Sequence, residues 1–97
     1  MAKVVDITEK LSFDDNPKLV IKGEEFEVNS DATTVLQMMG DFSNKSEIDA
    51  SLSAYDRMFG EKDRKRIEKM KLPFKDLMKI IEEGMNLVMG EDDQGEQ

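Results

Sequence analysis

Pairs of adjacent carboxylates are the residues of this sequence that most resemble catalytic groups. They occur as Asp14–Asp15, Glu24–Glu25 and Glu82–Glu83. Two carboxylates can serve as the acid and the base of a reaction only when both side chains reach the same substrate. Neighbouring residues point in different directions on a helix or a strand, so these pairs do not converge. The sequence also has no histidine and no cysteine, which removes the commonest general base and any thiolate.

Motifs that bind phosphate or activate a nucleophile are missing as well. The sequence contains no glycine-rich loop followed by Lys and Ser or Thr, no GxGxxG and no GxSxG. The acidic segments DDNPK (14–18) and EDDQGEQ (91–97) lack the alternation and the closing Glu of a calcium loop. We therefore expect a protein that is not an enzyme and that holds no cofactor and no metal.

A cluster of positive charge in segment 61–71 is the first feature that suggests binding. Its basic residues are spaced i, i+3, i+4, i+7 and therefore share one face of a helix. They are Lys62, Lys65, Arg66 and Lys69. This basic stripe is either a docking face for an acidic partner, including the acidic tail of another copy, or a solvated face opposite Ile67 and Met70. The net charge of −8 argues against a general nucleic-acid binder.

The second such feature is the helix predicted for FKDLMKIIEEGMNLVMG (74–90). Its apolar residues fill an arc of roughly 200°, although a helix that lies on a core needs only about 100°. One edge of this arc, the methionine edge, carries Phe74, Met78, Met85 and Met89. Methionine is flexible and suits surfaces that must accept imperfectly matched apolar partners. Either one edge binds a partner, or the rest of the domain buries the helix on most sides; an oligomer allows both.

The patterns around these residues predict an α+β fold, in which a β-hairpin packs on a bundle of about four helices. The 97 residues form one small domain, expected to span 1–90. The segment VVDITEKLSF (4–13) predicts either a third strand at the N-terminus or an arm that docks on the core or reaches a neighbour. The segment 91–97 is acidic, has no apolar residue and is expected to be a disordered tail.

The hairpin is predicted from KLVIKGEEFEV (18–28), which allows two registers. A two-residue loop at 23–24 places Ile21 opposite Phe26, so that apolar side chains pair on one face. A loop at 22–23 places Ile21 opposite a glutamate and buries less apolar surface. We therefore expect the loop at 23–24.

Two helices are expected directly after the hairpin. The first begins at Asn29, Ser30 or Asp31, and Gly40 interrupts or ends it. Its apolar face carries Val35, Met38, Met39 and Phe42. The second helix begins at Ser46, which caps it in a weak version of the capping box. Its buried stripe is expected to be Ile48, Leu52, Tyr55 and Phe59.

Two more helices complete the predicted bundle. A short one covers segment 61–71, with Ile67 and Met70 facing inward. Pro73 suits the first turn of the last helix, which Gly90 is expected to close.

The order of these segments resembles the tail assembly chaperones of long-tailed phages and prophages of Gram-positive bacteria. The resemblance spans roughly residues 4–93 and joins DITEKLSF, DDNPKLVIKGEEFEVNSDATTVLQMMG and EKDRKRIEKMKLPFKDLMKIIEEGMNLVMGED. Its most specific portions are KLVIKGEEFEVNSDA and KLPFKDLMKIIEEGMNLVMGED.

The resemblance implies a non-enzymatic protein of the host cytoplasm that is absent from the finished virion. Such chaperones bind the tape measure protein, keep it soluble and help the major tail protein to polymerise around it. In many phages the same gene also yields a longer product by frameshifting. We expect these protein partners and self-association, with no nucleic acid and no membrane.

Two functions of other classes remain open alongside this one. The first is a small DNA-binding or regulatory module that uses the basic helix 61–71, although the acidic net charge opposes phosphate binding. The second is a structural protein of the virion, such as a head–tail joining component.

Overall fold

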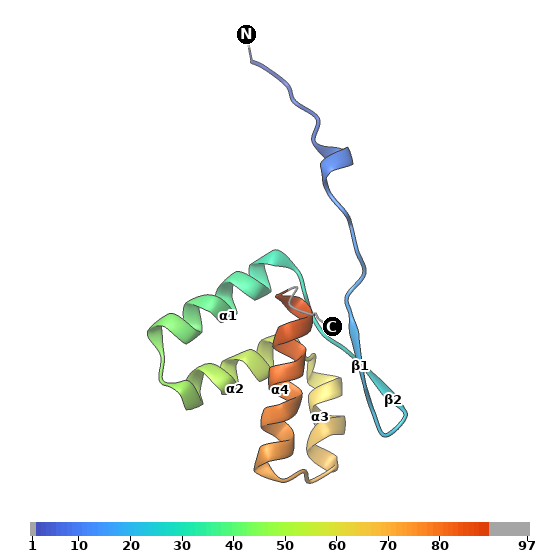
Figure 1. Ribbon diagram of the computed structural model, residues 1–97, viewed down its shortest axis with the longest axis vertical. Helices are drawn as coiled ribbons and strands as arrows, with labels where there is room; N and C mark the ends of the chain where they lie inside the picture. Colours follow the sequence, from blue (N-terminus) through green and yellow to red (C-terminus); the bar gives the residue numbers. More distant parts are fainter. Residues whose placement is uncertain (1, 90–97) are drawn as a thin grey trace, which may run out of the picture.

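The computed structural model describes residues 2–89, which form a β-hairpin followed by four helices (Figure 1). The elements are a short 3-10 turn Thr8–Lys10, strands β1 Lys18–Ile21 and β2 Glu24–Glu27, and helices α1 Ala32–Asn44, α2 Glu47–Met58, α3 Glu61–Lys69 and α4 Phe74–Val88. The predicted α+β class, with a hairpin packed on four helices, is confirmed. The expected helix end at Gly90 and the tail 91–97 lie outside the described residues.

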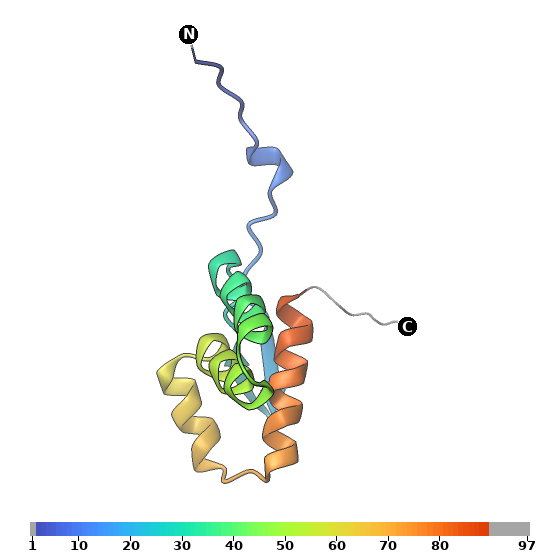
Figure 2. The same cartoon turned by 90° about the vertical axis from the view of Figure 1, so that its left-hand side faces the viewer.

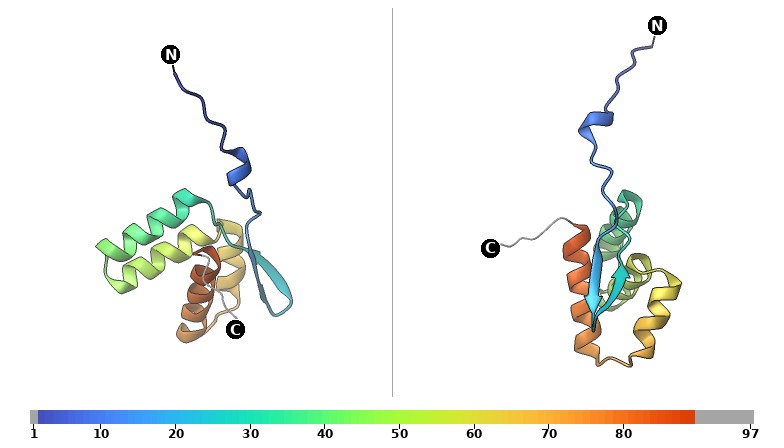
Figure 3. Two further views of the ribbon diagram at one scale, coloured as in Figure 1. Left: turned by 45° about the horizontal axis from the view of Figure 1, so that its top comes forward. Right: turned by 90° about the vertical axis from the view of Figure 1, so that its right-hand side faces the viewer.

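The hairpin lies between two of the four helices (Figure 3), so each of its edges has a different neighbour. Helices α1 and α2 are antiparallel neighbours, and α4 packs across α2 (Figure 1). The right-hand view of Figure 3 shows the β-hairpin between α4, on the side of β1, and α3, on the side of β2. The two edges of the hairpin therefore have different neighbours.

The predicted register of the hairpin is wrong. The strands pair with Ile21 opposite Glu24 and Leu19 opposite Phe26, around a loop at Lys22–Gly23. The choice of Gly23–Glu24 as the loop relied on apolar pairing alone. The backbone decides instead, because a tight two-residue turn matches the twist of the strands when both central residues have positive φ. Lys22 and Gly23 have φ values of 52° and 80°.

Residues 2–13 form an extended arm that leaves the domain (Figures 1 and 2). The only regular element in this arm is the 3-10 turn Thr8–Lys10, and the described residues contain no third strand beside the hairpin. The apolar side chains of the arm are exposed. They are Val4, Val5, Ile7, Leu11 and Phe13. The arm alternative for residues 4–13 is therefore the one observed, without the contact to the core of its own chain.

Side chains at the two caps fix where α1 and α2 begin. The carboxylate of Asp31 accepts from the backbone N–H of Thr34, and the hydroxyl of Ser46 accepts from the N–H of Asp49. Each cap satisfies a donor that the first turn of a helix leaves without a partner. The expected break at Gly40 is wrong, since α1 continues through it to Asn44. An isolated glycine weakens a helix interior but does not stop it.

The end of α2 is held by residues from the hairpin connection and from α3. The N–H of Asn29 donates to the carbonyl of Met58, and its side-chain amide donates to the carbonyl of Arg57. The guanidinium of Arg64 donates to the carbonyl of Asp56. The last carbonyls of a helix have no partner within it, so these bonds satisfy groups that would otherwise face the protein unpaired. These bonds also join the hairpin connection and α3 to the C-terminal end of α2.

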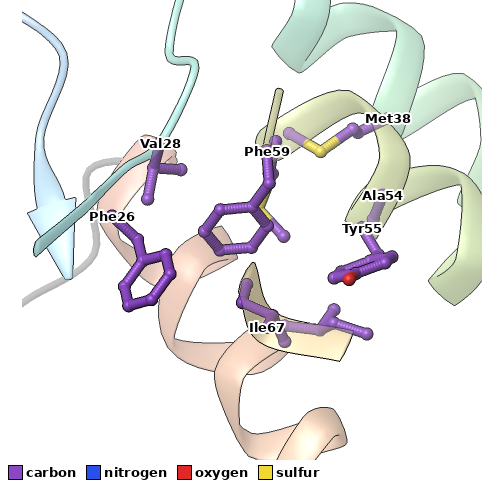
Figure 4. Close-up of a cluster of buried hydrophobic side chains, with 9 residues drawn as sticks. Phe26, Val28, Met38, Ala54, Tyr55, Phe59 and Ile67 are labelled. Atoms are coloured by element: carbon purple, nitrogen blue, oxygen red, sulfur yellow. The ribbon is translucent and has the colours of Figure 1, made fainter. Parts of the chain in front are cut away.

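The core lies where α2, α3, α4 and the hairpin meet (Figure 4). Its largest fully buried side chains come from four elements and their connections. They are Phe26, Phe59, Met38, Met58, Ile67 and Val28. The buried positions of Ile67 and Phe59 agree with the prediction. The predicted stripe of α2 is otherwise wrong at Ile48 and Leu52, which are exposed.

Small residues explain which face of α2 is buried. Ala50, Ser51 and Ala54 are buried together with Tyr55 and Met58. Small side chains let neighbouring helices approach closely, and both α1 and α4 pack against α2. The large apolar residues one or two positions away are then left at the rim of the contact.

Helices α2 and α4 cross most closely at Gly84. A Cβ atom at Gly84 would lie 3.0 Å from the Sδ atom of the fully buried Met58. A Cβ atom at Gly40 in α1 would meet nothing within 4 Å. The two glycines therefore serve different purposes, although both lie within helices.

We expect Gly84→Val to lower the free energy of unfolding by about 1–3 kcal/mol, because the added methyl groups overpack the crossing. The matched change Gly40→Val should raise it by a few tenths, roughly 0.4 kcal/mol, since Val forms helix better than Gly. Urea unfolding followed by circular dichroism measures both values. Equal effects at the two positions would contradict the close crossing.

A buried carboxylate joins α1 to α2. Asp41 lies on the buried side of α1, and its Oδ2 atom accepts a hydrogen bond of 2.9 Å from Nε of Arg57. Lys45 lies 3.4 Å from its other oxygen. The hydrogen bond from Arg57 and the positive charges of Arg57 and Lys45 hold the pKa of Asp41 below its usual value, against the effect of burial.

This pKa predicts how the stability depends on pH. Since the pKa is lower in the folded chain, the contribution of Asp41 is present above about pH 4 and is lost as the pH falls further. Asp41→Asn should therefore be less stable than the unmodified chain at pH 7, with a difference that shrinks towards pH 3. Thermal unfolding across this range tests it.

Asp56→Asn is the control, because Asp56 is exposed and lies 3.5 Å from Arg64. It should change stability little at any pH. A difference between Asp41→Asn and the unmodified chain that stays constant with pH would contradict the assignment.

Candidate interaction surface

In the basic stripe of α3, Arg66 makes contacts within the fold, whereas the three lysines are exposed to solvent. Arg66 places its guanidinium 4.0 Å from the centre of the Phe26 ring and forms ion pairs of 2.8 Å with Glu24 and Asp63. These acidic partners raise the pKa of Arg66. Arg66 therefore fixes the hairpin to α3, through a cation–π contact and two charge-assisted bonds.

The three lysines of the stripe are exposed to solvent. Lys62 and Lys69 have no ion pair within residues 2–89, and Lys65 lies 3.4 Å from Glu61 one turn earlier. Exposed pairs of this kind contribute little to stability. The face that remains for a partner thus consists of Lys62, Lys65 and Lys69, without Arg66.

Substitution of the stripe separates these two roles. We expect Arg66→Ala to lower the melting temperature, because it removes the ion pairs of Glu24 and Asp63 and uncovers the Phe26 ring. Lys65→Ala should leave the melting temperature unchanged. Thermal unfolding at pH 7 measures both melting temperatures. If the stripe binds nucleic acid instead, both variants must weaken binding to duplex DNA at low salt.

The methionine edge of α4 lies beside the core and only partly faces solvent. The middle of the apolar arc is buried, at Ile81 and Gly84. Met78 and Met85 are half-buried against the core, and Met89 is half-buried at the end of the helix. Phe74 is 78% exposed. The wide arc of α4 is thus explained mainly by packing, and Phe74 is its freely accessible member.

A mostly apolar hollow opens on the surface next to Phe74. It is bounded by α2, α3 and the start of α4, and its volume is about 300 Å³. Its apolar walls come from Leu52, Tyr55, Ile67, Leu72 and Leu77. We call it the α2–α4 hollow. Two of its rim positions, Glu68 and Lys71, are charged.

Two exposed apolar residues extend this hollow along the surface. Ile48 lies one turn before Leu52 and is 73% exposed, and Phe74 lies one turn before Leu77. Residues three or four positions apart on a helix are neighbours on its surface. The α2–α4 hollow is therefore continued by an apolar side chain on each of two helices.

Further apolar side chains are exposed on α1. Leu36 and Met39 are exposed, and Phe42 is partly so. The spacing of the α1 stripe predicted a buried face, but only Met38 on it is fully buried. The spacing cannot show how much of a stripe a partner helix covers. The small residues Ala50, Ser51 and Ala54 of α2 are the sequence signal that would have indicated which faces of the helices are in contact.

The phenolic hydroxyl of Tyr55 lies between α2 and α3. Burial and the charge of Glu68 raise the pKa of Tyr55 to about 12, so this hydroxyl stays protonated near neutral pH. It lies 3.2 Å from the carbonyl of Arg64 and from Oε2 of Glu68. Within the part of the chain that the structure describes, no group of three acidic side chains could hold a metal ion.

Among the described helices, none has the length and apolar character that a membrane crossing requires. Comparisons with protein-family models, with curated proteins and with solved structures found no match to this chain.

Proposed function

We propose that this chain is a tail assembly chaperone that binds the tape measure protein and assists assembly of the tail tube, without catalysing a reaction. The proposal combines the resemblance of residues 4–93 to that family with one structural observation. This observation is the α2–α4 hollow, which is open to solvent and flanked by the exposed side chains of Ile48 and Phe74. Exposed apolar patches of this kind mark sites of protein contact.

The chemistry of the α2–α4 hollow suits a helical client. An amphipathic helix presents apolar side chains at intervals of three or four residues, and these can fill an apolar groove. A tape measure protein is long, rich in such helices and prone to aggregate before the tube covers it. A shallow hollow gives weak contacts, which the major tail protein can displace, and many bound copies supply the total affinity.

The charge of the chain supports the same role. A net charge of −8 favours solubility of a loaded complex and opposes binding to nucleic acid. Of the basic stripe, the exposed Lys62, Lys65 and Lys69 remain accessible, because Arg66 is held by Glu24 and Asp63. A DNA-binding module is therefore the weaker candidate. A cytoplasmic chaperone that works as a homo-oligomer accounts for these features together.

Co-expression with the tape measure protein of the same genome tests the proposal. The soluble yield of that protein should rise, because the chaperone covers its apolar faces. Ile48→Asp together with Phe74→Asp should weaken the complex at least about tenfold, since two apolar contacts are lost. Both positions are exposed, so the variant should keep its melting temperature.

The control Ser43→Asp with Asn86→Asp adds the same charge at exposed polar positions and should bind normally. A tape measure protein that is fully soluble alone, or that gives no complex on a sizing column, would count against the proposal. Mass spectrometry of purified particles separates the remaining alternative, since a head–tail joining protein is present there and a chaperone is not.

A further inference from the structure

The outer edge of β2 is sealed by α3. The backbone N–H of Glu27 donates to Oδ2 of Asp63 at 3.3 Å, and the guanidinium of Arg66 donates to the carbonyl of Glu25 at 3.2 Å. These are backbone groups that point away from β1, because antiparallel strands turn alternate residues towards and away from their partner. The edge of β2 cannot accept another strand while α3 is in place.

The outer edge of β1 is open. The bond from the N–H of Val28 to the carbonyl of Pro17 fixes the alternation, so Leu19 bonds to β2 while Lys18 and Val20 face outward. Within residues 2–89, the outward N–H and C=O groups of Lys18 and Val20 have no hydrogen-bond partner. Val20 is also 65% exposed. An unpaired edge of this kind is a template for an added strand.

An apolar hollow lies directly beside this open edge. It separates β1 from α4, has a volume of about 360 Å³, and is lined mainly by apolar atoms. Its apolar walls come from Leu19, Val20, Ile21, Leu72 and Ile80. We call it the hairpin hollow. A strand that paired with β1 would hold the side chains of one face over this hollow and those of the other face in solvent.

The N-terminal arm has the sequence pattern of such a strand. From Val5 to Phe13 its odd-numbered positions are apolar except for Glu9, and its even-numbered positions are polar. Alternation of this kind is typical of a strand that is buried on one face. In the structure the same residues pair with no other strand and are exposed. The molecule thus contains an unpaired strand pattern and an unpaired strand edge.

The geometry of the arm points away from its own edge. Its exit from the domain is fixed at Asn16, whose Oδ1 accepts from the N–H and the hydroxyl of Ser30 and whose Nδ2 donates to Glu27. From there the arm runs away from the hairpin in both views (Figures 1 and 2). If the arm folded back onto β1 of its own chain, Phe13 and the two aspartates that follow it would have to form the turn. Phe13 would then no longer lie on the apolar face of the arm.

We propose that residues 4–13 of one copy add a strand to the open edge of β1 in a second copy, and that their apolar side chains fill its hairpin hollow. Exchange of arms is reciprocal in a dimer with twofold symmetry, so each copy loses one bare arm and one bare edge. The turn at Thr8–Lys10 is closed by bonds from the N–H of Lys10 to the carbonyl of Ile7 and from the N–H of Leu11 to the carbonyl of Thr8, and it opens on pairing. This contact uses the hairpin hollow instead of the α2–α4 hollow, although Leu72 lines both.

Sedimentation of the full chain over a range of concentrations tests the exchange. The unmodified chain should form a dimer, and Ile7→Asp with Leu11→Asp should raise its dissociation constant at least about tenfold, because charge enters the apolar hollow. Thr8→Asp with Ser12→Asp adds the same charge to the solvent face and should leave the dimer intact. All four positions are exposed, so folding should not change.

The edge is tested separately at Val20. Val20→Pro removes the outward N–H, which the fold does not use, and should weaken the dimer, whereas Val20→Thr keeps this donor and should preserve it. Unchanged melting temperatures show that both variants fold. A chain that stays monomeric up to about 100 µM, or dimers that ignore both the arm and the edge variants, would overturn the proposal.

Cross-linking identifies the occupant, because the chain has no cysteine of its own. Equal amounts of Ser12→Cys and Val20→Cys chains, treated with a short bismaleimide, should give a covalent heterodimer that contains one of each. A chain that carries both cysteines and cross-links only within itself would show that the arm folds back. Heterodimer formation only when the tape measure protein is present would assign the edge to the client, and either result rejects the proposal.

Discussion

The burial of Phe26 is the constraint on which the rest of this structure depends. A hairpin of two four-residue strands is not stable alone in water, so it must bury a side chain against the helices. Phe26 is fully buried in the core on one side, and the guanidinium of Arg66 covers its ring on another. Because Arg66 also bonds to Glu24 and Asp63, the same contact orients α3 and seals the outer edge of β2.

The small size of the domain then determines what stays exposed. Within residues 2–89, the largest fully buried side chains fill the contacts between the helices and the hairpin. A chain of this length buries only about two-thirds of its unfolded surface. The remaining exposed apolar residues lie at the α2–α4 hollow, at the hairpin hollow, on α1 and along the arm. Exposed apolar surfaces of this kind are typical of contacts between polypeptides.

Particular residues show how far the sequence was informative about the site. The spacing of Lys62, Lys65, Arg66 and Lys69 correctly placed them on one helix. It could not show that Arg66 bonds to Glu25 and Glu24 of the hairpin, 41 and 42 residues earlier. The arc of α4 correctly predicted a helix, but packing accounts for most of its width, since Met78, Met85 and Met89 are half-buried and Phe74 is the exposed member of the edge. Ile48 and Leu52 were expected in the core because spacing alone cannot weigh them against Ala50 and Ala54.

The sequence by itself determined the elements of this protein. Local rules suffice for the cap at Ser46, for a helix start within residues 29–31, for the periods of the four helices and for the alternation in the arm, because each acts within a few residues. The tertiary structure alone decided the hairpin register, the buried face of α2 and which strand edge stays open. Those features depend on positive φ at Lys22, on how closely helices approach, and on contacts between residues far apart in the chain, and none of these is written in local spacing.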